Sequence, residues 1–400
     1  MVSHAWAIHP GGDPVTDVCG MTHRNRYLAA VRWRCAVLAV FAAIANSAED
    51  AVLHHTIAHG LPILVASGEY AAIGKALGTA QLPTIHAMLA VAGGAPVPAG
   101  DPRLAAIRPG HRAEITAAAQ AAGVPVAVLL ASHLVIEPRC TAVFVPATAG
   151  RPAAPGRPAT VARNMDFGPA DLLAAATCLH VWRVPGSRAV AGVGWPGFSG
   201  VISGMNDAGV CGCVLLNFAG NPLPPGEPLP LRLRACLEQA GNAAEAAALF
   251  TARPAPGSDH YVLFADASTA VLAWWTATGP QTERAVPGTV LAVDNEPRGT
   301  GERERRLRAL VPADADETAL RQALTAVFLK GINAQSMVLS PANRELSLAL
   351  AVGPTPASHG SWRDLKLAPW FAGHAPEPGQ VTVRAPVKPL THYTEGPGAP

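Results

Sequence analysis

Cys140-Thr-Ala-Val-Phe-Val145 and, one hairpin later, Arg163-Asn-Met-Asp166-Phe-Gly168 are the stretches that decide how this sequence folds. The first is a short apolar run of β type that follows a helical region. The second also suits a buried strand, yet it carries two opposite charges. Because charged side chains in a buried strand need partners, the pair predicts a functional site. Taken alone, Cys140 is one of seven cysteines, and an inert buried thiol is its simplest interpretation.

The chain around these stretches divides into two parts. Residues 46–139 are predicted to be mainly helical; residues 112–122, for example, are alanine-rich and end at Gly123, a typical helix C-cap. Residues 140–384 carry short β-type runs separated by Gly/Pro turns, which favours antiparallel strands mixed with helices. The expected fold class is therefore α+β. Residues 385–400 are rich in Pro and Gly and are predicted to be a loose tail.

Composition excludes several functional classes. The 400 residues are 50% hydrophobic and 14% charged, which is enough apolar material for a large core and rules out a wholly disordered chain. A formal net charge of +2 does not suit a protein that binds nucleic acid through a basic surface. No apolar run reaches the roughly 18 residues of a membrane span. No motif predicts a cofactor, and no CxxC pair suggests zinc.

The N-terminus resembles an export signal. Residues 24–34 carry four arginines and no acidic residue, and an apolar run follows over residues 35–45. Ala43-Ile-Ala45 is an A-x-A cleavage site. We therefore expect residues 1–45 to be a leader and signal peptide, with Met21 as a natural start, and the mature protein to be periplasmic or secreted. The alternative is a buried amphipathic helix. Five cysteines remain after residue 45, so an oxidising compartment permits two disulfides beside one nucleophile.

The motifs resemble those of N-terminal-nucleophile amidohydrolases. Cys-Thr at the start of a strand, followed by Arg-Asn-Met-Asp-Phe-Gly, resembles acid ceramidase and N-acylethanolamine acid amidase. Ser203-Gly-Met-Asn206-Asp-Ala-Gly209, with Leu-Leu-Asn-Phe soon after, is similar to choloylglycine (bile-salt) hydrolases and penicillin V acylase. Residues 68–78 are similar to isopenicillin N acyltransferase. The resemblance covers about residues 60–350.

This resemblance implies a four-layer αββα fold and a zymogen that cuts its own Arg139–Cys140 bond. The cut frees the α-amine of Cys140, whose reference pKa of about 7.7–8.0 suits a general base. The thiolate then attacks an amide carbonyl and forms an acyl-enzyme. The implied partners are a small N-acyl amide and the two processed chains, which stay together as a heterodimer.

The resemblance also assigns site residues. Asp166 matches the residue that holds the α-amine, and Arg163 matches the one that favours the thiolate. Asn206 matches a site Asn that donates to the oxyanion or orients the nucleophile. Asn295 is the expected second oxyanion donor, although Asp294 stands where these families have Thr.

A last site arginine is expected in residues 302–310. We choose Arg306 for its Arg-Leu-x-x-Leu context, with Arg303 and Arg305 behind it. Each of these arginines can instead be a solvated charge on a helix face, and Asn295 can be a turn residue.

The remaining candidates are weaker. Trp195 and Phe198 are predicted to be core or hairpin aromatics that, if functional, line the acyl pocket. A histidine group, His54, His55 and His59, lacks the Glu of an HExxH motif, so no metal site is predicted.

The leading functional hypothesis is an exported cysteine amidase that acts on linear amide C–N bonds rather than primarily on peptide bonds. An acyltransferase on the same scaffold and a catalytically dead binding protein are the alternatives from other classes. A further alternative is a thiol enzyme with His133 as its base, which requires Cys140 to remain uncut.

Overall fold

The described part of this computed structural model comprises residues 51–92, 100–134, 138–149, 156–221 and 223–392. The predicted signal peptide lies outside these residues. Within them, no helix combines the length and the apolar character that a bilayer crossing requires.

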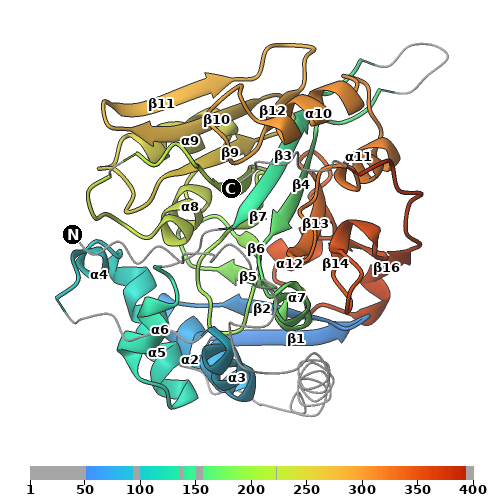
Figure 1. The fold of residues 1–400 in the computed structure, drawn as a ribbon. Coiled ribbons are helices and arrows are strands. Elements are labelled where there is room, and N and C mark those ends of the chain that lie inside the picture. Colours follow the sequence, from blue (N-terminus) through green and yellow to red (C-terminus); the bar gives the residue numbers. More distant parts are fainter. Residues whose placement is uncertain (1–50, 93–99, 135–137, 150–155, 222, 393–400) are drawn as a thin grey trace, which may run out of the picture.

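Two sheets form the centre of the molecule (Figure 1). The larger has nine strands, in the spatial order β1 (Val52–Ala58), β2 (Leu61–Ser67), β5 (Cys178–Arg183), β6 (Val190–Gly194), β7 (Ser203–Asn206), β8 (Cys211–Leu216), β9 (His260–Ala265), β10 (Ala270–Thr276) and β11 (Gly279–Arg284). The smaller has seven, in the order β12 (Leu291–Val293), β3 (Arg139–Val145), β4 (Thr160–Asp166), β13 (Asn333–Ser340), β14 (Glu345–Leu350), β15 (Trp362–Lys366) and β16 (Val381–Arg384). Neighbouring strands are antiparallel except for β2 and β5, which are parallel.

Helices cover the outer face of each sheet. The nine-stranded sheet carries α2 (Tyr70–Ala80), α3 (Leu82–Ala92), α5 (Pro109–Ala122), α8 (Leu229–Leu237) and α9 (Ala243–Thr251). The seven-stranded sheet carries α10 (Glu302–Leu310) and α11 (Glu317–Leu324), at the upper right of Figure 1. The shorter helices are α4 (Pro102–Ala105), α6 (Val126–Ala131), α7 (Ala170–Ala176) and α12 (Ala368–Phe371). The predicted α+β fold with two sheets between helical layers is confirmed.

Strand alternation divides the core between the two interfaces. In β3, Ala142 and Phe144 pack in the cluster shared by both sheets, whereas Val143 and Val145 pack against α10 and α11. Successive side chains of a strand point to opposite faces, so each strand of the smaller sheet serves both layers. Residues at the ends of β3 and β4 can therefore reach the space between the sheets or the helical layer, depending on their parity.

The first residues after the predicted leader differ from the prediction. Residues 52–67 form the β1–β2 hairpin, not a helix, and His59 and Gly60 make its turn with φ of 49° and 76°. The reason is the apolar run Leu61–Ser67, which is too short for a buried helix and is almost entirely covered in the sheet. Adjacent histidines of β1 point to opposite faces, and the described residues contain no cluster that could hold a metal ion. The predicted helix over 112–122 is confirmed as part of α5, with Gly123 as its C-cap at φ 67°.

Two further observations concern the tail and the cysteines. The tail, predicted to be loose from residue 385, contacts the domain as far as it is described: Leu390 N–H donates to Thr325 Oγ1 at 2.9 Å, and His392 Nε2 lies 2.8 Å from the Phe328 carbonyl oxygen. The five described cysteines are all free and buried, so the disulfides that the sequence permits do not form among them.

Candidate active site

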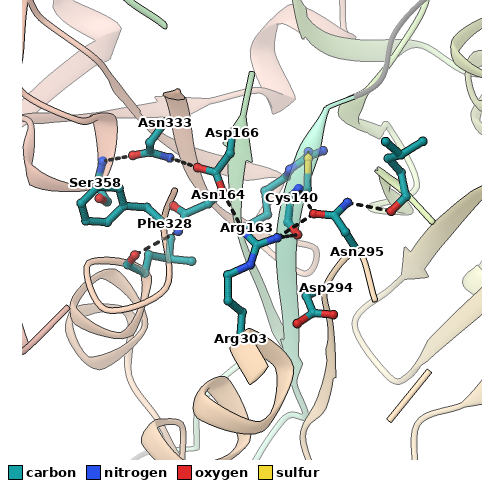
Figure 2. A network of polar contacts seen from close by, with 12 residues as sticks. Cys140, Arg163, Asn164, Asp166, Asp294, Asn295, Arg303, Phe328, Asn333 and Ser358 are labelled. Carbon is teal, nitrogen blue, oxygen red and sulfur yellow. Dashed lines mark hydrogen bonds and ion pairs between the residues drawn. The ribbon is translucent and has the colours of Figure 1, made fainter. Parts of the chain in front are cut away.

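Cys140, near the start of β3, has different surroundings on three sides. Its side chain points between the sheets, its main-chain nitrogen faces the end of β12, and the helical layer lies behind it. The residue is fully buried, and the chain continues through the Arg139–Cys140 bond, which lies within β3. Figure 2 shows the polar side chains that converge here.

From β4, Arg163 reaches the sulfur. Its Nη2 lies 2.6 Å from Cys140 Sγ, and the residue is itself fully buried. The larger sheet fixes the guanidinium: Nη1 donates to Ser203 Oγ at 2.6 Å, and Nη2 also donates to the Val214 carbonyl at 3.2 Å. The cation beside the thiol is therefore held by strands β7 and β8, which belong to the other sheet.

Asn295 holds the nitrogen of the same residue. Its Oδ1 accepts the Cys140 N–H at 2.7 Å and an N–H of Arg303 at 2.7 Å. Its Nδ2 donates to the Leu216 carbonyl at 2.6 Å. Two donors face the oxygen and an acceptor faces the nitrogen, so the contacts define which way the amide points. One hydrogen of the Asn295 amide is used by the Leu216 carbonyl.

An ion pair in the helical layer completes the site. Arg303, on α10, donates to Asp166 Oδ2 at 3.0 Å and to the Cys140 carbonyl oxygen at 3.4 Å. Asn333 donates to the other carboxylate oxygen of Asp166 at 2.9 Å, and its own oxygen accepts the Ser358 N–H. Asp166 lies three residues after Arg163 in β4, so the two side chains point to opposite faces of the strand. The Asp166 side chain therefore contacts the helical layer.

Burial controls the protonation of both titratable groups. Burial raises the pKa of the Cys140 thiol to about 11, although the neighbouring Arg163 opposes this effect. Burial likewise raises the pKa of Asp166 to about 6, against the opposing charge of Arg303 and the hydrogen bond from Asn333. In the uncut chain at neutral pH, the thiol is thus protonated and Asp166 is a carboxylate.

Two predicted residues lie elsewhere. Asn206 donates to the carbonyls of Leu237 and Ala240, both at 2.8 Å, and its oxygen accepts the N–H groups of Ala208 and Val210. It fastens the end of β7 to the helical side of the larger sheet, so its predicted role as an oxyanion donor is not supported.

The predicted site arginine also needs correction. Arg306 bonds the Thr391 carbonyl in the tail. It is Arg303, the second choice, that reaches the nucleophile. Arg305 pairs with Glu302 on the exposed side of α10.

His133 cannot serve as the base for Cys140. Its Nδ1 lies 2.8 Å from the Leu129 carbonyl oxygen, and its Nε2 accepts the Ser199 N–H at 2.9 Å. Burial lowers the pKa of His133 to about 4, so the ring is neutral and both nitrogens are used. This removes the thiol enzyme with a histidine base from the alternatives.

The predicted pocket aromatics form a buried cluster. Trp195 packs against Phe167 with ring centroids 6.2 Å apart and against Phe198 at 5.9 Å. Phe198 in turn stacks on His133 at 5.0 Å. Because Phe167 directly follows Asp166, this cluster begins at the end of the strand that carries the site.

Sequence reasoning missed Asn333, and it did not place the end of β8 beside the Arg139–Cys140 bond. Nothing in the run around Asn333 marks it as a partner of Asp166, because only the pairing of β13 with β4 brings them together. At the end of β8, the Leu216 N–H donates to the Pro138 carbonyl at 3.2 Å, and Phe218 lies under the Arg139 guanidinium at 5.3 Å. The Leu-Leu-Asn-Phe motif thus borders the Arg139–Cys140 bond.

No protein-family model matches this sequence, and no curated protein matches it. Solved structures do show similarity. An N-acylethanolamine-hydrolyzing acid amidase ortholog from Caenorhabditis elegans is 17% identical over 50% of this chain and 93% of that chain, with a TM-score of 0.43. Penicillin V acylase from Agrobacterium tumefaciens is 13% identical over 63% and 100%, with a TM-score of 0.44. A mutant of the conjugated bile acid hydrolase from Clostridium perfringens is 11% identical over 64% and 99%, with a TM-score of 0.39. Each of these TM-scores is below 0.5.

Proposed function

We propose that this chain is a cysteine amidohydrolase that activates itself by cutting its Arg139–Cys140 bond and then cleaves a linear amide C–N bond of an N-acyl compound. One observation carries the proposal. Side chains hold the main-chain nitrogen of Cys140 as well as its sulfur, Asn295 at 2.7 Å and Arg163 at 2.6 Å. A thiol that acts from inside a chain needs partners only for its sulfur, whereas an N-terminal nucleophile needs them for both atoms.

The self-cleavage step balances with one water. The thiol loses its proton and adds to the Arg139 carbonyl carbon. Collapse of the tetrahedral intermediate breaks the C–N bond, with the proton going to the departing nitrogen of Cys140. Water then hydrolyses the thioester, which gives the Arg139 carboxylate, a free thiol and a free α-amine. Asn295 and Arg303 hold the nitrogen and carbonyl of Cys140 during this exchange.

Turnover repeats this chemistry on an external amide. The new α-amine takes the thiol proton, and Arg163 stabilises the thiolate as it forms. The thiolate attacks the acyl carbonyl, the amine product leaves with the proton, and water releases the acid. The second hydrogen of the Asn295 amide serves the oxyanion. We propose that Trp195 and Phe198 border the substrate pocket, which would make an apolar acyl group the substrate.

We further propose that the protein is exported and that it consists of two chains after the cut. The basic segment and the apolar run at residues 24–45 support export to the periplasm or beyond. The cut product is a heterodimer of residues 46–139 and residues 140–400. Its two chains share the larger sheet, because β2 pairs with β5.

The decisive experiment is intact mass and N-terminal sequencing of the purified protein. We expect two chains, the larger beginning at Cys140, and cleavage of a chromogenic N-acyl amide by the cut protein. Cys140→Ala should remain one chain and be inactive, whereas Cys236→Ala, which removes another buried thiol, should be cut normally. A wild-type protein that is active but uncut contradicts the proposal, and so does an inactive protein whose larger chain starts elsewhere.

A further inference from the structure

Asp294, the residue between the last β12 position and Asn295, is buried with only 1% of its surface exposed. Its Oδ1 accepts the Glu296 N–H at 3.0 Å, and its Oδ2 accepts the Glu304 N–H at 2.9 Å. The first of these bonds closes a tight turn around Asn295. The second reaches ten residues along the chain from Asp294, to Glu304 in the first turn of α10.

This carboxylate caps helix α10 from outside it. The residue at the N-cap, Gly301, has no side chain, so it cannot satisfy the free N–H groups of the first turn. Asp294 supplies the acceptor, and its negative charge also suits the positive end of the helix dipole. The first turn of α10 carries Arg303, between the capped Glu304 and the exposed Glu302.

Gly301 has no Cβ, which leaves room for the Asp294 carboxylate. Its φ of −66° is open to any residue, so no backbone strain requires glycine here. A Cβ at Gly301, however, would overlap both carboxylate oxygens of Asp294. The three atoms nearest to such a Cβ all belong to Asp294, so the close approach of this carboxylate requires glycine here, and the two residues form one contact between α10 and the end of β12.

We propose that Asp294 is a positioning residue, which sets helix α10 so that Arg303 reaches both Asp166 and Asn295. The inference rests on the proposed function, because Arg303 is one of the groups around Cys140 (Figure 2). Asp294 thus orients two neighbours of the nucleophile at once: Asn295 through the turn and Arg303 through the helix.

This role has a consequence for pH dependence. The groups that face the Asp166 carboxylate are Arg303 from α10, Asn333 from β13 and the Leu329 N–H, with Arg163 and Cys140 close by. Arg303 is the largest of the influences that lower the pKa of Asp166. If α10 shifts, the pKa of Asp166 rises. The pH below which the rate of self-cleavage falls, called here the acidic limb, then moves to a higher value. If the loss of a helix cap leaves Arg303 in place, the pKa of Asp166 is unchanged and the acidic limb does not move.

The test compares Asp294→Ala, Gly301→Ala and the double variant. Each single variant should slow self-cleavage by about 10²-fold, the order expected for a misplacement of about 1 Å. In the Asp294→Ala background the three atoms nearest to the new Cβ are gone, so Gly301→Ala should cost no more than about twofold, the spread of independent sites. Asp294→Asn keeps the shape and one acceptor, so it should retain more activity than Asp294→Ala.

A matched control is available on the next helix. Asp316 caps α11 by accepting the Ala319 N–H at 2.8 Å, and it is exposed and belongs to a different helix from Arg303. Asp316→Ala should lower stability as a lost cap does, yet leave both the rate and the acidic limb of self-cleavage unchanged.

A second readout does not depend on self-cleavage. Arg303, whose side chain is 9% exposed, should react faster with an arginine-specific dicarbonyl reagent in Asp294→Ala than in the wild type, as measured by peptide mass. Arg321 on α11 should react equally in both. Unchanged protection of Arg303, or additive effects of Asp294→Ala and Gly301→Ala, overturns the inference. Failure of the wild type to cut itself instead overturns the proposed function and leaves the reactivity result to decide the role of Asp294.

Discussion

Replacing Arg163 by methionine removes the cation beside the nucleophile without opening a large cavity. The guanidinium lies 2.6 Å from Cys140 Sγ and 2.6 Å from Ser203 Oγ, and all of it is buried. Burial already raises the pKa of the thiol, and Arg163 is the strongest influence that opposes this. Arg163→Met should therefore raise the thiol pKa further.

The size of the effect follows from two opposing terms. A nearby opposite charge shifts a pKa by about 1–3 units, so losing it lowers the thiolate fraction at neutral pH by about 10–10³-fold. A more basic thiolate is also more nucleophilic, with a Brønsted slope of about 0.4–0.5, which restores nearly half of that loss on a logarithmic scale. The net decrease in the rate of self-cleavage should be about 3–60-fold at neutral pH, and it should shrink as the pH rises.

The assay is the rate of self-cleavage against pH, followed by intact mass, with thiol alkylation of the cut protein as a second probe. Arg163→Lys keeps the charge and should shift the profile less. Arg321→Met, which removes a buried arginine from helix α11 on the outer face of the same sheet, controls for loss of stability, and circular dichroism checks the fold. If Arg163→Met is folded and its rate of self-cleavage has the same pH midpoint as that of the wild type, the electrostatic role of Arg163 is refuted.

Four further results are expected. Asn295→Ala should slow self-cleavage and single-turnover acylation alike, by about 10²–10³-fold, because its amide holds the nucleophile's nitrogen; a loss below about threefold contradicts this. Arg303→Ala should block self-cleavage while Arg306→Ala leaves it intact, as read on a denaturing gel. Self-cleavage should fall as the pH drops through about 6, where Asp166 gains a proton and loses its ion pair, and Asp166→Asn should abolish this limb. Asn206→Ala should lower the free energy of unfolding by about 1–3 kcal/mol in urea titrations, and its direct effect on acylation should be absent.

Strand parity explains which site residues the sequence could identify. Arg163 and Asp166 stand out because a β-type run cannot bury charges without partners. Their spacing of three in a strand also places them on opposite faces, one toward the thiol and the other toward the helices. The same rule applied to β7 separates Ser203, which holds Arg163, from Asn206, which faces α8.

Choosing the site arginine of α10 requires knowing which face of the helix is buried. Leu307 is the fully buried apolar residue of this helix, and Arg303 lies one turn before it on the same face. That signal was present in the sequence, but the Arg-Leu-x-x-Leu context favoured Arg306. Asn333 had no such signal, because its partner is 167 residues away and is set by sheet pairing.

The larger sheet takes strands from both sides of the bond that we expect to be cut. Among the strands that the structure describes in this sheet, β1 and β2 precede Cys140, and they join the rest of the sheet through the β2–β5 pair. Before the cut, every contact in that sheet forms within one chain, so folding is a unimolecular process whose rate does not depend on concentration. After the cut, the same sheet can be rebuilt only when two molecules meet. Denaturation of the mature protein is then a one-way event at low concentration, and the durability of the enzyme depends on how slowly its sheet opens rather than on how well it refolds.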